Sequence, residues 1–275
     1  SEMCIRDSLI SDAGNNFKLS YEKKREILRN NIWGVDIDIL AVEVAKFSLL
    51  IKLIEDSSLY EMESFVKNNN CRILPSLDNN IKNGNSLVDE KYIEFNSNIL
   101  NDPEMIEKIK IFNWENEFAG EKFDAIVGNP PYIRVQNMVH FSENEYEYYK
   151  SEVSKYETAK SDLLDKYFLF MEKGLQLLKP KGKMGYIIPH KFMLIKSGAS
   201  LRKLLSEKKC VKQIIHFGTE QVFKGRSTYT CLVFVEKNER KTFEIGFVKD
   251  INKFYATEST EMKEYPIAVS YTHLT

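Results

Sequence analysis

The side chains best suited to chemistry lie in the tetrapeptide Asn129-Pro130-Pro131-Tyr132, which directly follows the apolar stretch FDAIV. Each proline fixes its own φ angle and biases the preceding residue toward extended backbone, so a stiff loop is expected. The Asn129 side-chain oxygen and the Pro130 carbonyl can both accept a hydrogen bond from one planar amino group. Hydrogen bonds to two such acceptors would draw the nitrogen lone pair out of conjugation and leave it free to attack. The alternative is a proline-rich turn in which Asn129 only caps a backbone group.

The elements around this loop predict an α/β fold, because short apolar β-type runs alternate with longer amphipathic stretches. In such sheets ligands bind beyond the carboxyl ends of the strands, where Asp36, Asn85 and Asn129 lie. The polar segment 133–161 is expected to be a lid or an irregular excursion. Strands are predicted at 31–37, at the start of 80–89, and at 122–128, 183–189, 211–217 and 227–237, the last of them at a sheet edge. Helices are predicted at 38–56, 103–112, 163–178 and 198–209. A Lys-Pro-Lys-Gly turn is predicted at 179–182, between the third helix and the strand that follows it.

Composition excludes several classes of protein. The 275 residues are 43% hydrophobic, 12% aromatic and 29% charged, enough to bury a sizeable core, so a disordered chain is excluded. Apolar runs stay far below the roughly 20 residues that a membrane span needs, and no secretory signal is visible. A cytoplasmic protein is therefore expected. The cysteines are far apart, which favours reduced thiols and no metal site; they are Cys4, Cys71, Cys210 and Cys231.

Charge is unevenly distributed along the chain. The net charge is −1, yet residues 179–226 hold twelve Lys or Arg against Glu207 and Glu220, a local charge of +10. Such a stretch is either a solvated surface or a contact for phosphate groups.

These motifs resemble those of class I, S-adenosylmethionine-dependent, adenine-specific DNA methyltransferases of restriction-modification and phage-defence systems. The motif that carries the likeness is [DNS]-P-P-[YFW], and the resemblance runs from about Asn30 to Glu236. It implies a Rossmann-like sheet with helices on both faces. It also implies transfer of a methyl group to the exocyclic amino group of an adenine in double-stranded DNA, with Asn129, Pro130, Pro131 and Tyr132 as the catalytic loop.

The same resemblance implies the residues that bind S-adenosylmethionine. Asp36 would accept both ribose hydroxyls and Ile37 would lie against the adenine ring, although Asp36 could instead help cap the next helix. Asn85 stands where the family usually has an acidic residue that takes the cofactor's amino group, and a plain turn is the alternative. Phe170 would lie beside the cofactor, unless it is a core residue.

For the substrate, the resemblance implies that the target adenine is flipped out of the duplex and stacked between Tyr132 and Phe223. The basic stretch would hold the DNA backbone close to this pocket. The residues expected to do so are Lys191, Lys196, Lys224 and Arg226.

The chain also departs from the family pattern. No glycine-rich cofactor loop precedes Asp36, so the family's first strand and that loop are expected to be missing. Residues 9–236 would then be a partial catalytic domain, and 237–269 the start of a connection to a missing target-recognition domain. Residues 1–8 and 270–275 resemble translated adaptor sequence and are expected to be non-native. Little activity is expected of such a fragment alone.

Two other functions stay open at this point. A protein glutamine methyltransferase shares the NPPY loop, because the glutamine amide is also a planar NH2 group. A non-catalytic DNA-binding fragment is the other alternative. If the chain is a DNA methyltransferase, a restriction endonuclease or a specificity subunit is a possible partner. His190 and His216 have no partner in sequence and are interpreted as structural.

Overall fold

The structure, a computed structural model, describes residues 9–11, 17–133, 144–160, 164–223, 225 and 228–267. It divides into two compact units, each of which is described by itself. Unit 1 comprises Ser1–Asp89 and Glu104–Ala119, and unit 2 comprises Glu90–Pro103 and Gly120–Thr275. The residues expected to be non-native, 1–8 and 270–275, lie outside the described part.

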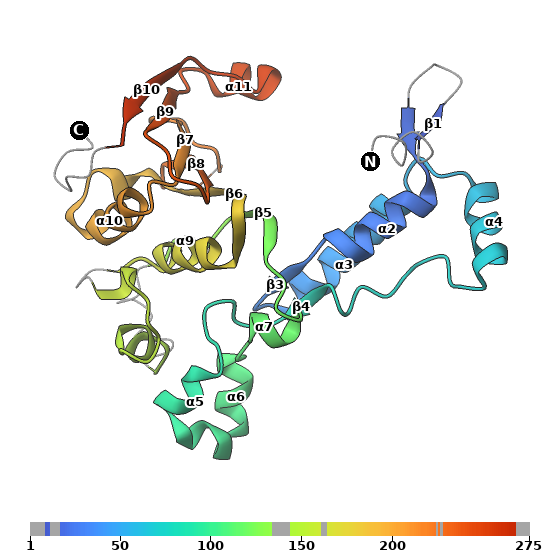
Figure 1. The fold of residues 1–275 in the computed structure, drawn as a ribbon, viewed down its shortest axis with the longest axis horizontal. Helices are drawn as coiled ribbons and strands as arrows, with labels where there is room; N and C mark the ends of the chain where they lie inside the picture. Colours follow the sequence, from blue (N-terminus) through green and yellow to red (C-terminus); the bar gives the residue numbers. More distant parts are fainter. Residues whose placement is uncertain are drawn as a thin grey trace. The chain divides into compact units, whose positions relative to one another are not determined.

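Unit 1 begins with the antiparallel strands β1 (Leu9–Ser11) and β2 (Phe17–Leu19), followed by helix α2 (Tyr21–Asn31) (Figure 1). Strand β3 (Gly34–Asp36) then leads into α3 (Ile39–Ile54). Asp38 caps α3 as predicted, because its side chain accepts a hydrogen bond of 2.9 Å from the Leu40 N–H.

The second half of unit 1 completes a two-stranded parallel sheet. Helix α4 (Leu59–Asn69) starts with a capping box between Ser58 and Glu61, and β4 (Ile81–Asn83) pairs in parallel with β3. Helices α6 (Pro103–Ile109) and α7 (Trp114–Glu117) follow later in the chain, α6 with the predicted Pro103 start. The core joins α2, α3, α4 and β4 through Tyr21, Leu28, Val42, Leu53, Met62, Leu77 and Ile81.

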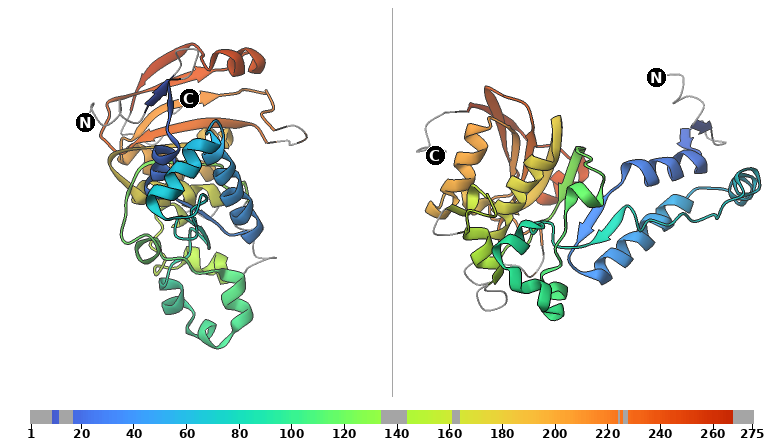
Figure 2. Two further views of the ribbon diagram at one scale, coloured as in Figure 1. Left: turned by 90° about the vertical axis from the view of Figure 1, so that its right-hand side faces the viewer. Right: turned by 60° about the horizontal axis from the view of Figure 1, so that its bottom comes forward.

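Unit 2 contains one six-stranded sheet in the order β10-β9-β7-β8-β6-β5 (Figures 1 and 2). Strand β5 (Phe123–Gly128) is an edge strand parallel to β6 (Leu178–Pro189), and β7 (Val211–His216) is parallel to β9 (Thr242–Phe247). Strand β8 (Thr230–Glu236) runs antiparallel between β6 and β7, and β10 (Met262–Pro266) is antiparallel to β9. The sheet is therefore mixed, and the predicted α/β class is confirmed.

Two local predictions need correction. The strand expected at a sheet edge, 227–237, is the interior strand β8, because it returns antiparallel between two strands that precede it. The Lys-Pro-Lys-Gly segment lies within β6, but the pairing with β5 jumps from Phe123–Leu178 to Ala125–Lys183. The four residues are thus unpaired with β5 and form a bulge within one strand, where a separate turn was predicted.

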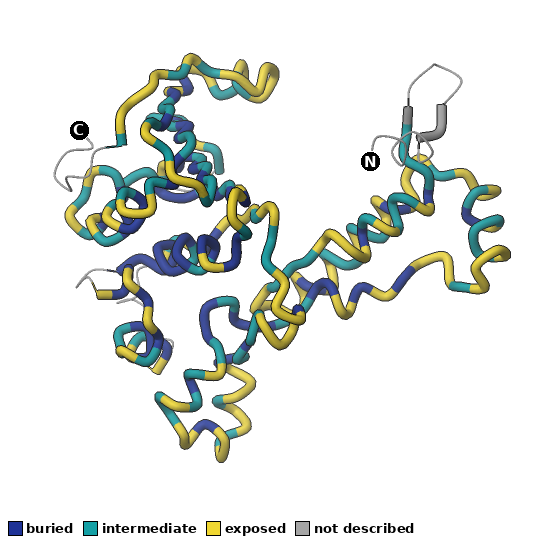
Figure 3. Tube along the Cα trace, viewed as in Figure 1, coloured by how far each residue is buried: buried dark blue, intermediate teal, exposed yellow. Residues whose placement is uncertain are grey.

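Helices complete unit 2. Helix α9 (Lys166–Leu177) is buried along most of its length, and α10 (Ala199–Glu207) buries three leucines (Figure 3). Residues 237–267 continue the fold as β9, α11 (Ile251–Thr257) and β10, so this tail forms part of the sheet. The remaining short elements are α5 (Lys91–Phe95), η1 (Ser97–Asn101), η2 (Thr158–Lys160), η3 (His190–Met193) and η4 (Lys196–Gly198).

The excursion expected at 133–161 is partly regular. Residues 144–150 are helical and 158–160 form η2, while 134–143 lie outside the described residues. The buried Glu172 side chain of α9 accepts hydrogen bonds from the Glu157 and Thr158 N–H groups and from the Thr158 hydroxyl, at 2.8–2.9 Å. Within the described ranges, none of the helices combines the length and apolarity that a bilayer-spanning segment requires.

Candidate active site

The NPPY loop leaves the sheet at the carboxyl end of β5, as the sequence predicts. Asn129 is exposed, Pro130 is buried and Tyr132 is half-buried. Gly128 precedes them, and a Cβ there would lie 3.0 Å from the Tyr186 ring, so a small residue lets the loop approach β6 closely. The Asn129 amide is therefore presented to solvent at the end of an edge strand.

The Tyr132 hydroxyl holds the Asn129 side chain in place. It lies 2.7 Å from Asn129 Oδ1 and 3.1 Å from the Ile187 carbonyl, and its single proton can be donated to either oxygen. Burial raises the pKa of Tyr132 to about 12, so the hydroxyl stays protonated and remains a donor at neutral pH. An incoming amino group would thus meet an acceptor whose position is already set.

The first turn of α9 contacts this loop through a backbone hydrogen bond and an aromatic ring. The Lys166 N–H donates to the Ile133 carbonyl at 2.8 Å. The fully buried Tyr167 ring meets Tyr132 edge to face, with ring centroids 6.5 Å apart and an interplanar angle of 83°. Sequence reasoning missed Tyr167 because nothing local relates it to a loop so far away in the chain.

The residues expected to contact DNA belong to unit 2, and the structure describes only some of them. Phe223 is half-buried in the connection between β7 and β8, and Lys196 is exposed in η4. Lys191 forms an ion pair with the buried Asp165, with Nζ 3.4 Å from Oδ2, so part of its charge is already compensated. Lys224 and Arg226 lie outside the described residues.

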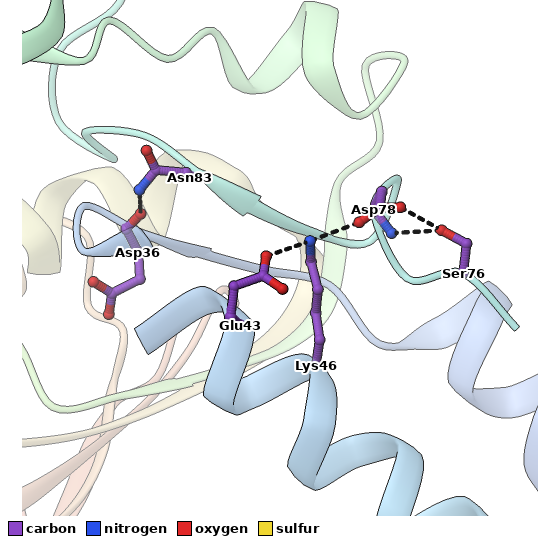
Figure 4. A network of polar contacts seen from close by, with 6 residues as sticks. All are labelled: Asp36, Glu43, Lys46, Ser76, Asp78 and Asn83. Carbon is purple, nitrogen blue, oxygen red and sulfur yellow. Dashed lines mark hydrogen bonds and ion pairs between the residues drawn. The ribbon is translucent and has the colours of Figure 1, made fainter. Parts of the chain in front are cut away.

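In unit 1, Asp36 ends β3 beside Asn83, its register partner on β4. The Asp36 carbonyl accepts from the Asn83 side-chain amide at 3.0 Å and from the Gly84 N–H at 2.9 Å (Figure 4). The Asp36 carboxylate is exposed; Oδ1 accepts from the Asp38 N–H at 2.8 Å, and Oδ2 has no partner in the described part of the chain. Ile37 is 46% exposed beside it. Asn83, which sequence reasoning missed, thus fixes the loop that carries both residues.

A second polar group seen in Figure 4 ties α3 to the segment before β4. The Lys46 ammonium lies 3.0 Å from Glu43 and 2.6 Å from Asp78, and the Ser76 hydroxyl donates to Asp78 at 2.6 Å. These hydrogen bonds raise the pKa of Lys46 and lower that of Asp78.

Asn85 and Phe170 are less accessible to a cofactor than Asp36 and Ile37. Asn85 is only 3% exposed; its Oδ1 accepts from the Leu87 N–H at 3.1 Å and its N–H donates to the Lys110 carbonyl at 2.7 Å. This is the geometry of an Asx turn. Phe170 is half-buried on α9, in unit 2. The structure thus groups Asp36, Ile37 and Asn85 in one unit and the NPPY loop with Phe170 and Phe223 in the other.

His190 and His216, at the ends of β6 and β7, stack with ring centroids 4.4 Å apart. Burial lowers the pKa of both imidazoles, and the positive charge of His190 lowers that of His216 further. The unfolded chain therefore binds more protons than the folded one as the pH falls below about 6.5, so the free energy of unfolding should decrease there.

We expect His190→Phe to reduce this acid sensitivity, because phenylalanine keeps a ring in the stack and cannot be protonated. Urea denaturation at pH 7 and at pH 5 would measure it. An equal loss of stability between the two pH values in the wild type and the variant would contradict the prediction.

The structure has a mixed α/β sheet with the NPPY loop at the carboxyl end of a strand, as the resemblance to class I methyltransferases implies. The comparisons with known proteins identify the family. Residues 30–223, more than half of the chain, match the model of the Eco57I restriction-modification methylase family, and the chain belongs to that family.

Two relatives of the chain are named as type II methyltransferases. It is 41% identical over 245 residues to the Escherichia coli type II restriction enzyme and methyltransferase RM.Eco57I, covering 89% of this chain and 22% of that protein. It is 28% identical over 174 residues to the Haemophilus influenzae type II methyltransferase M.HincII, covering 62% of this chain and 33% of that protein. The chain therefore spans a third or less of the length of either relative.

Among solved structures, the DrdV–DNA complex shares the fold. The TM-score is 0.55 at 14% sequence identity, and the match covers 90% of this chain and 25% of that one.

Proposed function

We propose that this chain is the methyl-transferring part of a restriction-modification DNA methyltransferase that modifies the exocyclic amino group of adenine. The observation that carries the proposal is the Asn129 side chain, exposed at the end of β5 and held by the Tyr132 hydroxyl. Membership of the Eco57I methylase family supports DNA as the substrate. A restriction endonuclease activity, in the same protein or a partner, and a cytoplasmic site of action belong to the same proposal.

The cofactor of the proposed reaction is S-adenosylmethionine, whose sulfonium supplies the methyl group. The residues of unit 1 fit its nucleoside half. The free Oδ2 of Asp36 can accept from a ribose hydroxyl, and the exposed Ile37 side chain offers an apolar surface to an adenine ring. Asn85 contributes through the turn that it closes, and Phe170 is proposed to lie along the cofactor.

The residues of unit 2 act on the base. The Asn129 Oδ1 and the Pro130 carbonyl each accept a hydrogen bond from the target amino group, so that the nitrogen lone pair is available to attack. Tyr132 keeps Asn129 oriented and presents its ring to the base, with Phe223 as the proposed ring on the other side. The amino nitrogen would form its bond to the methyl group as the sulfonium–methyl bond breaks, and the methylated nitrogen would then lose one proton to water. The chain's own contribution is therefore positioning.

Adenine specificity can be tested with tritiated S-adenosylmethionine and duplex DNA. After methylation the DNA is hydrolysed to nucleosides, and we expect the label in N6-methyl-2′-deoxyadenosine. Label in methylcytosine would overturn the adenine assignment. Label in a glutamine-containing protein, with none in DNA, would favour the protein glutamine methyltransferase.

Stacking on the flipped base predicts a second result. Tyr132→Ala and Phe223→Ala should each weaken DNA binding by about 1–3 kcal/mol, whereas Tyr132→Phe should change binding little because it keeps the ring. A duplex with a mismatched target should bind more tightly than a matched one, since less pairing is broken. Fluorescence anisotropy with matched and mismatched duplexes measures both effects. Equal affinity of the alanine variants and the wild type would rule out stacking.

A further inference from the structure

Unit 1 contains a pocket of about 650 Å³ that the proposed methyl transfer does not use. Trp33 and Asn80, which line it, directly precede β3 and β4. The two strands are parallel, so the pocket lies at their amino ends. Asp36 and Asn85 lie at the opposite, carboxyl ends of these strands, Asp36 as the last residue of β3 and Asn85 just after β4. The pocket is thus distinct from the cofactor-binding residues of this unit.

Three arginines line this pocket. Arg25 and Arg29 are four residues apart on α2 and share one helix face, and Arg72 comes from the segment after α4. Throughout the described part of the chain, none of the three has a carboxylate within ion-pair distance. Acidic residues of the same segments are paired with lysines instead, Glu26 with Lys23 and Asp78 with Lys46. Three permanent positive charges therefore face the pocket uncompensated.

Arg25 is held in place, in part by an interaction with Tyr21, while one of its donor atoms still lacks an acceptor. Its guanidinium carbon lies 5.2 Å from the centroid of the Phe65 ring, on which it packs. Its Nε is buried and has no hydrogen-bond partner among the described residues. A buried donor without an acceptor is costly, and a bound oxyanion would remove that cost.

The carboxyl-terminal end of α2 lies at this pocket, but its carbonyl groups are partly neutralised and do not prevent anion binding. The last carbonyls of a helix carry partial negative charge that repels anions. The Asn80 amide donates to the Arg29 carbonyl at 2.7 Å and to the Ile32 carbonyl at 3.0 Å, which neutralises part of that charge. Asn80 is buried, so this part of the pocket lining is fixed before any ligand binds.

We propose that this pocket binds phosphate groups, either of a free nucleotide or of the DNA backbone. Planar guanidinium groups match the oxygens of a phosphate in pairs, and three of them suit a ligand with more than one negative charge. The volume is that of a small-molecule site, and the Trp33 ring adds an aromatic surface of the kind that nucleotides use. The site is independent of the proposed methyl transfer.

Calorimetric titration of the whole chain with inorganic pyrophosphate at low salt tests the proposal. We expect a dissociation constant of about 1 mM or tighter, weakened about tenfold or more by Arg29→Ala and by Arg72→Ala. Lys67→Ala, an exposed lysine of α4 with the same charge change, should leave the affinity within about twofold. Absence of binding, or equal affinity in all variants, would overturn the proposal. No step of this assay depends on methyl transfer.

Competition then separates the two phosphate sources. If the DNA backbone is the source, a duplex displaces pyrophosphate, and each arginine substitution lowers the salt slope of DNA binding by about 1. If a nucleotide is the source, ATP displaces pyrophosphate and the duplex does not. Displacement by neither would overturn the assignment to phosphate esters. In a Trp114→Phe background Trp33 is the sole tryptophan, so pyrophosphate should change its emission, and an unchanged spectrum would place the ligand elsewhere.

Discussion

Asn129→Ala should lower the single-turnover rate of DNA methylation in the full-length protein by about 10²–10³-fold. The substitution removes the oxygen proposed to accept a hydrogen bond from the target amino group, while Asp36 and Ile37 are untouched. Binding of S-adenosylmethionine should therefore stay within a few fold of wild type. Rapid-quench assays and equilibrium dialysis measure the two quantities.

Two further variants make this prediction specific. Tyr132→Phe keeps the ring but removes the hydroxyl that holds Asn129, so its rate should fall by about tenfold, with DNA affinity little changed. Asn98→Ala, an exposed asparagine in η1, should behave as wild type. If Asn129→Ala keeps more than about a tenth of the wild-type rate, Asn129 is not the acceptor.

The largest effect on stability should come from Glu145→Ala. Glu145 and Lys166 form an ion pair of 2.8 Å whose side chains are 8% and 11% exposed, and the Tyr149 hydroxyl also donates to Glu145. Removing the carboxylate leaves a buried ammonium without its partner, which costs about 3–5 kcal/mol. Urea denaturation at neutral pH measures the free energy of unfolding.

The pair also matters to the candidate active site, because the Lys166 N–H donates to the Ile133 carbonyl and the next residue, Tyr167, contacts the Tyr132 ring. A Glu145→Leu, Lys166→Met double variant should recover most of the stability, since it buries no charge. The exposed pair of Glu157 and Lys160, 3.6 Å apart, provides the control: Lys160→Ala should cost less than about 1 kcal/mol. A similar loss for Glu145→Ala and Lys160→Ala would show that the buried pair has no special role.

Short-range signals in the sequence were sufficient for much of the fold. The Asp38 cap, the Pro103 helix start and the strand that ends in the NPPY loop all lie where they were predicted. Each depends on dihedral preferences or on hydrogen bonds within a few residues, so neighbouring residues determine it. The α/β class follows from the same local patterns repeated along the chain.

Contacts between distant segments could not be read in this way. The interior place of β8, the Tyr167 ring against Tyr132, the ion pair of Lys191 with Asp165 and the pocket that joins Arg29 to Arg72 each depend on where a remote segment packs. Packing is decided by burial and hydrogen bonding across the whole unit, which sequence spacing does not encode. The amino-acid sequence by itself therefore determined the class of fold and the place of the NPPY loop at the end of a strand. Only the tertiary structure decided which side chains hold that loop and which charges are left without a partner.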